Sequence, residues 1–85
     1  MHKAAAYEAL ARELERWRWL PKQELVTNVG KPASVHSVNI DGQDSAVEVA
    51  AHWQKEEGGA IRVTGVANGP SHWRLERLEE SIVVP

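Results

Sequence analysis

Residues 35–53 predict a β-hairpin. Apolar and polar residues alternate in two segments, which the dipeptide Asp41-Gly42 separates. Asp-Gly between such segments is typical of a two-residue type I′ turn, because both turn residues need positive φ angles. A turn of that length fixes the strand register, which predicts the pairs Ile40–Gln43, Val38–Ser45 and His36–Val47. One face of the hairpin then carries the following residues of the two strands: His36, Val38, Ile40, Val47, Val49, Ala51 and Trp53.

The second segment also has a helical interpretation. Ser45-Ala46-Val47-Glu48 fits a capping box, and a helix over residues 46–57 would end at Gly58-Gly59. The apolar residues of this segment nevertheless keep a period of two without a break, and the partner strand agrees with them in phase. We therefore favour the strand.

Residues 4–18 predict an amphipathic helix. Its apolar residues recur at spacings of three and four, as Tyr7, Leu10, Leu14 and Trp17, with Ala11 beside them. The favourable pair Glu8–Arg12 is offset by the unfavourable pair Arg12–Arg16, so the helix depends on docking its apolar stripe. Trp19 points away from that stripe if the helix continues. We expect it to lie past the helix end, repacked; an exposed aromatic at a contact surface is the alternative.

A short second helix is predicted over residues 22–28. Pro21 is suited to the first helical position, and Gly30 stops the helix. Its buried side would be Leu25, Val26 and Val29. Two helices joined by a tight turn suggest a DNA-reading motif, but Lys22 is the only cation of the second helix. DNA binding is therefore a minor hypothesis.

Two further strands are predicted after the hairpin. Between residues 61 and 67 apolar and polar positions alternate, and Gly65 in the middle indicates close approach of the helix or of Trp73. A turn over residues 68–71 leads to a fourth strand at residues 73–76. Leu78 and Ile82-Val83-Val84 form a terminal apolar segment.

Length and composition limit the classes of protein to which the chain can belong. The 85 residues fit a single domain, 1–85, with one small core, and the absence of cysteine fits a reducing compartment. A net charge of −2 provides no basic field for binding nucleic acid. Charged residues interrupt any secretion signal at Glu8, Arg12 and Glu13, and no later segment could span a membrane. We expect a cytoplasmic protein that binds neither nucleic acid nor membranes.

Several short patterns resemble a group of small uncharacterised bacterial α+β proteins. They are Val29-Gly30-Lys31-Pro32, Asp41-Gly42, Val47-Glu48-Val49 with Trp53, Gly58-Gly59 before Ile61-Arg62-Val63 and Gly65, and Trp73-Arg74. The match covers about two thirds of the chain by its packing and turn pattern. The group usually has aspartates before the Gly-Gly turn and a more apolar last strand. The resemblance implies an antiparallel sheet with helices on one face, and it implies no activity.

Glu48 and His52 are the one acid–histidine pair at a motif-like spacing. On a helix they would meet, but on a strand they stand roughly 13 Å apart at about 3.3 Å per residue. His36, His52 and His72 fall on three strands, so we expect no metal site and no cofactor. Neither a nucleophile elbow nor a phosphate-binding glycine loop is present. We expect no enzyme activity.

The remaining candidate is the second face of the predicted sheet. It carries Glu48, His52, Arg62, Thr64, Arg74 and Glu76. One interpretation is a solvated face whose opposite charges pair across strands. The other is a binding surface, because a sheet with helices on one side leaves this face open, and Arg with neighbouring Trp is enriched at interface hot spots.

The sequence thus predicts an α+β fold, with one long and one short N-terminal helix packed on one face of a four-stranded antiparallel β-meander. We expect a non-enzymatic interaction protein that uses this polar face, and a homodimer formed through the face or a sheet edge. The first alternative is a phage or mobile-element inhibitor or immunity-type protein, which would dock its charged face or the acidic turn Glu56-Glu57 against a larger partner. The second is a hydrolase-like enzyme that uses Glu48 and His52.

Overall fold

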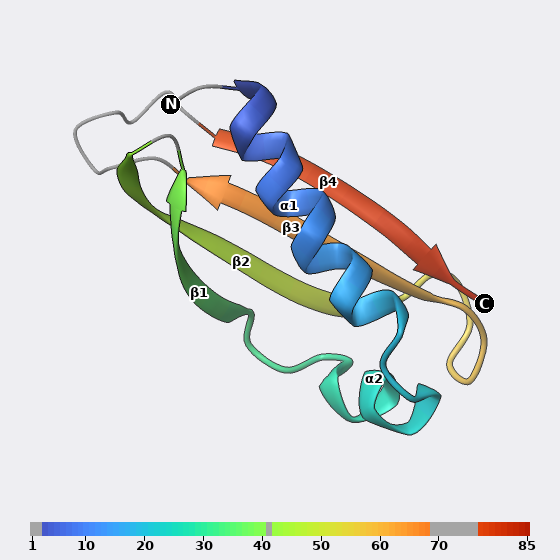
Figure 1. Ribbon diagram of the computed structural model, residues 1–85. Coiled ribbons are helices and arrows are strands. Elements are labelled where there is room, and N and C mark those ends of the chain that lie inside the picture. Colours follow the sequence, from blue (N-terminus) through green and yellow to red (C-terminus); the bar gives the residue numbers. More distant parts are fainter. Residues whose placement is uncertain (1–2, 41, 69–76) are drawn as a thin grey trace.

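The chain folds into two helices followed by a four-stranded antiparallel sheet, which confirms the predicted α+β class (Figure 1). The structure is a computed structural model that describes residues 3–40, 42–68 and 77–85. The elements follow in the order α1 (Lys3–Arg18), α2 (Lys22–Asn28), β1 (Ser34–Ile40), β2 (Gln43–Trp53), β3 (Ile61–Asn68) and β4 (Arg77–Val84). Strands that are consecutive in the chain are neighbours in the sheet, so the sheet is a meander.

The predicted hairpin register is confirmed. The pairs are Ile40–Gln43, Val38–Ser45 and His36–Val47. Gly42 has a φ angle of +81°, the left-handed conformation that the turn requires, and its amide donates a hydrogen bond to Oδ1 of Asn39 at 3.0 Å. The helical interpretation of residues 46–57 is wrong. β2 pairs with β1 on one side and β3 on the other, so its backbone groups are satisfied by the sheet.

Helix α1 lies across one face of the sheet, above β3 and β4 (Figure 1). The core between them includes the buried side chains of Leu10, Leu14, Trp17, Val49 and Val63. A Cβ atom added to Gly65 of β3 would lie 3.2 Å from Cδ2 of Leu10 and 3.4 Å from Cδ2 of Leu14. The predicted close approach at Gly65 is therefore that of the helix, because a side chain there would enter the space that α1 fills.

The buried side of α1 is rotated from the predicted stripe. Ala6 and Glu13 are buried, whereas Tyr7 is 41% exposed and Ala11 is also exposed. The reason is the position of the helix near the β4 edge of the sheet. Side chains on that flank of α1 lie beside β4 and stay accessible, while the opposite flank turns toward β1 and β2.

Trp19 only partly follows its prediction. Helix α1 ends at Arg18, so Trp19 does lie past the helix end, but it is 79% exposed and is not repacked. Its indole Nε1 donates a hydrogen bond to Oε2 of Glu15 at 3.0 Å. This bond fixes the ring against the helix end and leaves most of its apolar surface accessible.

Helix α2 has the predicted bounds. Pro21 directly precedes it with a φ angle of −55°, and the Pro21 carbonyl accepts hydrogen bonds from the first turn. Gly30, with a φ angle of +79°, follows its C-terminal end. Leu25 is fully buried and Val29 packs on the core, but Val26 is 41% exposed, because so short a helix turns only a narrow side toward the sheet.

The strand that pairs with β3 is the terminal apolar segment. Residues 77–84 form β4, with pairs that run from Asn68–Arg77 to Ile61–Val84. The fourth strand predicted at residues 73–76 lies outside the described residues. Among the described helices, none combines the length and apolar character needed to cross a membrane.

Candidate binding surface

The face of the sheet opposite α1 carries the described members of the predicted site. We call it the open face and define it by the following side chains: Glu48, Ala50, His52, Arg62, Thr64, Val66, Arg77, Glu79 and Ser81. His52 lies opposite Arg62 in the strand pairing, and Ala50 lies opposite Thr64. No helix of the described ranges covers this face (Figure 1). Arg74 and Glu76, also predicted for the site, lie outside the described residues.

Arg62 lies across three segments of the open face. Its Nε donates to Oε1 of Gln54 at 2.7 Å, and its Nη1 donates to Oγ of Ser81 on β4 at 2.9 Å. Both acceptors are uncharged, and the side chain is exposed. Within the described residues no carboxylate forms an ion pair with Arg62. The guanidinium is thus held in place while its positive charge stays available.

A shallow hollow of about 260 Å³ lies beside Arg62 on the open face. Its lining consists of Ala33, Glu48, Ala50, His52, Thr64, Val66 and Arg77. Ala50 of β2 and Val66 of β3 supply small and apolar side chains. His52 and Arg77 stand toward opposite ends of the hollow, and Glu48 lies beside Val66. The hollow therefore combines an apolar floor with polar borders, the arrangement found at protein interfaces.

Glu48 and His52 do not form a pair. They lie four positions apart on β2, which separates them by roughly 13 Å at about 3.3 Å per residue. The carboxylate of Glu48 instead accepts a hydrogen bond from Nδ2 of Asn68 at 2.9 Å. The structure brings both residues to one hollow but does not bring them within reach for shared proton or metal chemistry.

Four polar residues of this surface were missed from the sequence. Gln54 and Ser81 hold Arg62, Asn68 holds Glu48, and Arg77 borders the hollow. The strand register could have revealed them, since Ser81 lies opposite Thr64 and Arg77 lies opposite Asn68. That register was out of reach once the fourth strand had been assigned to residues 73–76.

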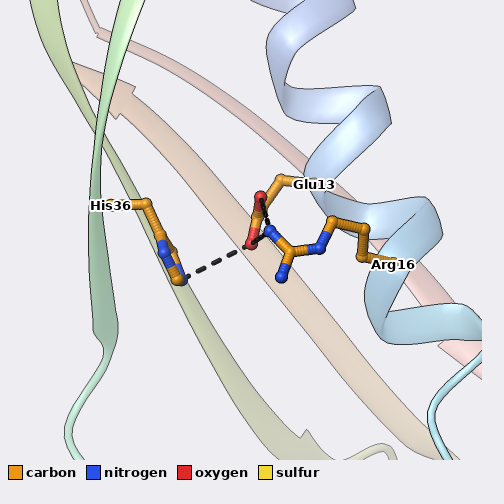
Figure 2. A network of polar contacts seen from close by, with 3 residues as sticks. All are labelled: Glu13, Arg16 and His36. Atoms are coloured by element: carbon orange, nitrogen blue, oxygen red, sulfur yellow. Dashed lines mark hydrogen bonds and ion pairs between the residues drawn. The ribbon is translucent and has the colours of Figure 1, made fainter.

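A second polar cluster lies between α1 and β1, on the side of the sheet that faces the helix. Figure 2 shows Glu13 between His36 and Arg16. Oε1 of Glu13 lies 3.4 Å from Nε2 of His36, and Oε2 accepts a hydrogen bond from Nη1 of Arg16 at 3.2 Å. The Glu13 side chain is only 11% exposed, whereas that of Arg16 is 70% exposed. Sequence reasoning missed this cluster. Its signal was one polar residue on each of two faces that pack together, Glu13 on the helix and His36 on the hairpin.

A groove of about 390 Å³ runs along the opposite flank of α1, between the helix and β4. It is lined by Tyr7, Ala11, Leu14, Glu15, Arg18, Glu80, Ser81 and Ile82. The Arg18 side chain bonds Glu15 at 2.7 Å, and the Trp19 indole bonds the same carboxylate. Both hydrogen bonds lower the pKa of Glu15 below its ordinary value. The bond from Arg18 has the larger effect and the bond from Trp19 the smaller one.

No group of acidic, histidine or cysteine side chains in the described part of the chain is arranged to hold a metal ion. Comparisons with protein-family models, with curated proteins and with solved structures give no match for this chain. The geometry of the surface therefore carries the functional argument.

Proposed function

We propose that the chain is a non-enzymatic interaction protein that binds a protein partner through the open face. The observation that carries the proposal is the state of Arg62, an exposed guanidinium held by Gln54 and Ser81 without a described carboxylate partner. An arginine whose rotamer is already fixed loses little entropy when a partner carboxylate arrives. Its hydrogen bonds to that carboxylate would be charge-assisted, the stronger kind.

The hollow beside Arg62 supports the same proposal. Ala50 and Val66 offer an apolar floor, and Glu48, His52 and Arg77 offer charge and hydrogen bonds at its borders. The two arginines, Arg62 and Arg77, would bind an acidic segment of the partner. Apolar side chains of that segment would pack on Ala50 and Val66. Arginine is among the residue types enriched at binding hot spots.

The direct experiment is capture from an extract of the source cells with three tagged proteins. Wild type and Arg12→Ala should recover the same partner, whereas Arg62→Ala should lose it. Arg12 is the matched control, because it is an exposed arginine on α1, paired with Glu8 far from the open face. Equal recovery by Arg62→Ala and wild type would count against the open face. Circular dichroism of each variant verifies the fold.

A second candidate, an inhibitor or immunity-type protein of a phage or mobile element, draws support from the turn after β2. Glu56 and Glu57 are exposed there, and neither forms an ion pair within the described residues. Such a protein would dock this acidic turn on a basic partner. Glu56→Lys with Glu57→Lys would then abolish capture, while Arg62→Ala would leave it intact.

A hydrolase that uses Glu48 and His52 ranks third, since the two side chains lie two pleats apart on β2. Bacterial origin and a cytoplasmic location remain predictions from the sequence. Both are consistent with the proposed binding role.

A further inference from the structure

The outer edge of β1 carries backbone groups that have no partners among the described residues. β1 is an edge strand of the described sheet, in which it pairs with β2. In an antiparallel ladder the hydrogen-bonded and non-hydrogen-bonded pairs alternate, and a two-residue turn is closed by a hydrogen-bonded pair, here Ile40–Gln43. The amides and carbonyls of Val35, Ser37 and Asn39 therefore point away from β2. No backbone hydrogen bond from elsewhere in the described residues reaches them.

This edge also lacks the usual protection against strand pairing. Natural edge strands are guarded by charged side chains, prolines or bulges. β1 has no Asp, Glu, Lys, Arg or Pro, and its pairing with β2 runs without a bulge. Val35 adds an apolar side chain that is 62% exposed. The other edge strand, β4, is guarded by Arg77, Glu79 and Glu80.

We propose that β1 pairs antiparallel with β1 of a second copy of the chain, around a two-fold axis at Ser37. Residues opposite each other in a sheet share a face, so the axis of a symmetric pair must pass through a residue position. An axis at Ser37 sets Ser37 opposite Ser37 of the second copy, and Val35 opposite its Asn39. All the outward backbone groups of β1 then have partners. An axis at His36 would set Asn39 opposite Ala33, and an axis at Val38 would set Val35 opposite residue 41, both outside β1.

The side chains tolerate this register. On the open side Val35 meets Asn39 of the second copy, and on the helix side His36 meets its Val38. No Asp, Glu, Lys or Arg of β1 is brought opposite a like charge, because the strand has none. In β4, an axis at Glu79 or at Glu80 would set two identical carboxylates opposite each other. The neutral edge is thus the self-complementary one.

The pairing joins the two four-stranded sheets into one continuous sheet. Because the axis stands perpendicular to the sheet, both helices α1 lie on one side and both open faces on the other. The dimer therefore presents two copies of Arg62 and its hollow on a single surface. The pairing uses the strand edge alone, so it stands independently of the proposed binding function of the open face.

The test is the molar mass in solution, measured by light scattering at micromolar concentrations. Wild type should have the mass of a dimer, and Ser37→Lys about half of it, because two ammonium groups would meet at the axis. Val83→Lys is the matched control, since Val83 is an exposed valine on the opposite edge strand, and it should remain dimeric. A monomeric wild type, a dimeric Ser37→Lys or a monomeric Val83→Lys would each overturn the proposal.

A second measurement decides the matter if Ser37→Lys fails to fold. The chain has no cysteine, so Ser37→Cys and Val83→Cys each carry one thiol. A short bismaleimide reagent should link Ser37→Cys into covalent dimers, because paired Cα atoms across the axis lie about 5.5 Å apart. It should leave Val83→Cys unlinked. Linkage through Val83→Cys and none through Ser37→Cys would overturn the assignment to β1.

Discussion

Arg62 differs from the arginines of α1 in the groups that hold it. Arg12, Arg16 and Arg18 each bond a glutamate on the same helix, at spacings of three or four residues. The exposed pairs Arg12–Glu8 and Arg18–Glu15 are of a kind that contributes little to stability, and all three pairs neutralise the arginine charge locally. Arg62 is held by an amide and a hydroxyl oxygen instead. Its charge is consequently available for a partner.

Glu15 allows a test at the residue scale. Arg18 and, to a smaller extent, Trp19 lower the pKa of Glu15 by donating hydrogen bonds to its carboxylate. Trp19→Phe should therefore raise the pKa of Glu15, and Arg18→Gln should raise it further. Carboxyl NMR titration measures both changes, with Arg12→Gln as the control, because Arg12 bonds Glu8. An identical Glu15 pKa in wild type and Trp19→Phe would show that the indole does not bond this carboxylate in solution.

The sign of the accompanying pH dependence follows from linkage. The pKa of Glu15 is lower in the folded state, so these hydrogen bonds stabilise the fold at a pH above the pKa in the unfolded chain. Their contribution is lost as the pH falls through the folded-state pKa. Trp19→Phe should weaken that dependence on pH.

At the scale of the elements, α1 depends on docking against the sheet. Leu14 is 3% exposed and lies above Gly65 of β3. Leu14→Ala should lower the free energy of unfolding by about 2 to 5 kcal/mol, because it leaves a cavity in the core of a small domain. Tyr7→Ala on the accessible flank should cost less, below about 1.5 kcal/mol. Urea unfolding measures both; equal losses would mean that α1 docks on a different side.

The hairpin was predictable from the sequence because two signals agreed. The Asp41-Gly42 turn set the register, and the alternation in both strands matched it. The strand β4 was not predictable in the same way, because its apolar and polar residues do not alternate. Glu79 is followed directly by Glu80, and Ile82 directly by Val83. Trp19 was expected to repack past the helix end, but its indole bonds the carboxylate of Glu15 and the ring stays exposed. Such polar contacts depend on where the chain turns, which composition does not reveal.

Within the candidate site, the sequence predicted the open-face positions of Glu48, His52, Arg62 and Thr64 through strand parity alone. The contacts that give those residues their properties come from other strands. Ser81 reaches Arg62 only because β4 pairs with β3 in the observed register. Sequence reasoning could thus assign residues to a face but could not assign their partners.

At the scale of the molecule, the described part of the chain places one helix layer on a meander and leaves one broad sheet face and two strand edges uncovered. Lys22 connects the start of α2 to the rest of the chain, with Nζ 3.2 Å from the Gly59 carbonyl and 3.0 Å from the Pro85 carbonyl. These bonds lie at the end of the sheet and leave the open face clear. The charged open face and the neutral edge of β1 then suit different partners, a second protein and a second copy.

The most direct test of the open face as a binding surface is site-specific photo-crosslinking in the source cells. A photoreactive amino acid placed at Thr64, inside the hollow, should crosslink to a distinct protein partner. The same amino acid at Arg12, on the solvent side of α1, should not. Adding Arg62→Ala to the Thr64 probe should remove the crosslink. A crosslink of equal yield from both positions, or one that persists with Arg62→Ala, would contradict a binding surface that depends on Arg62.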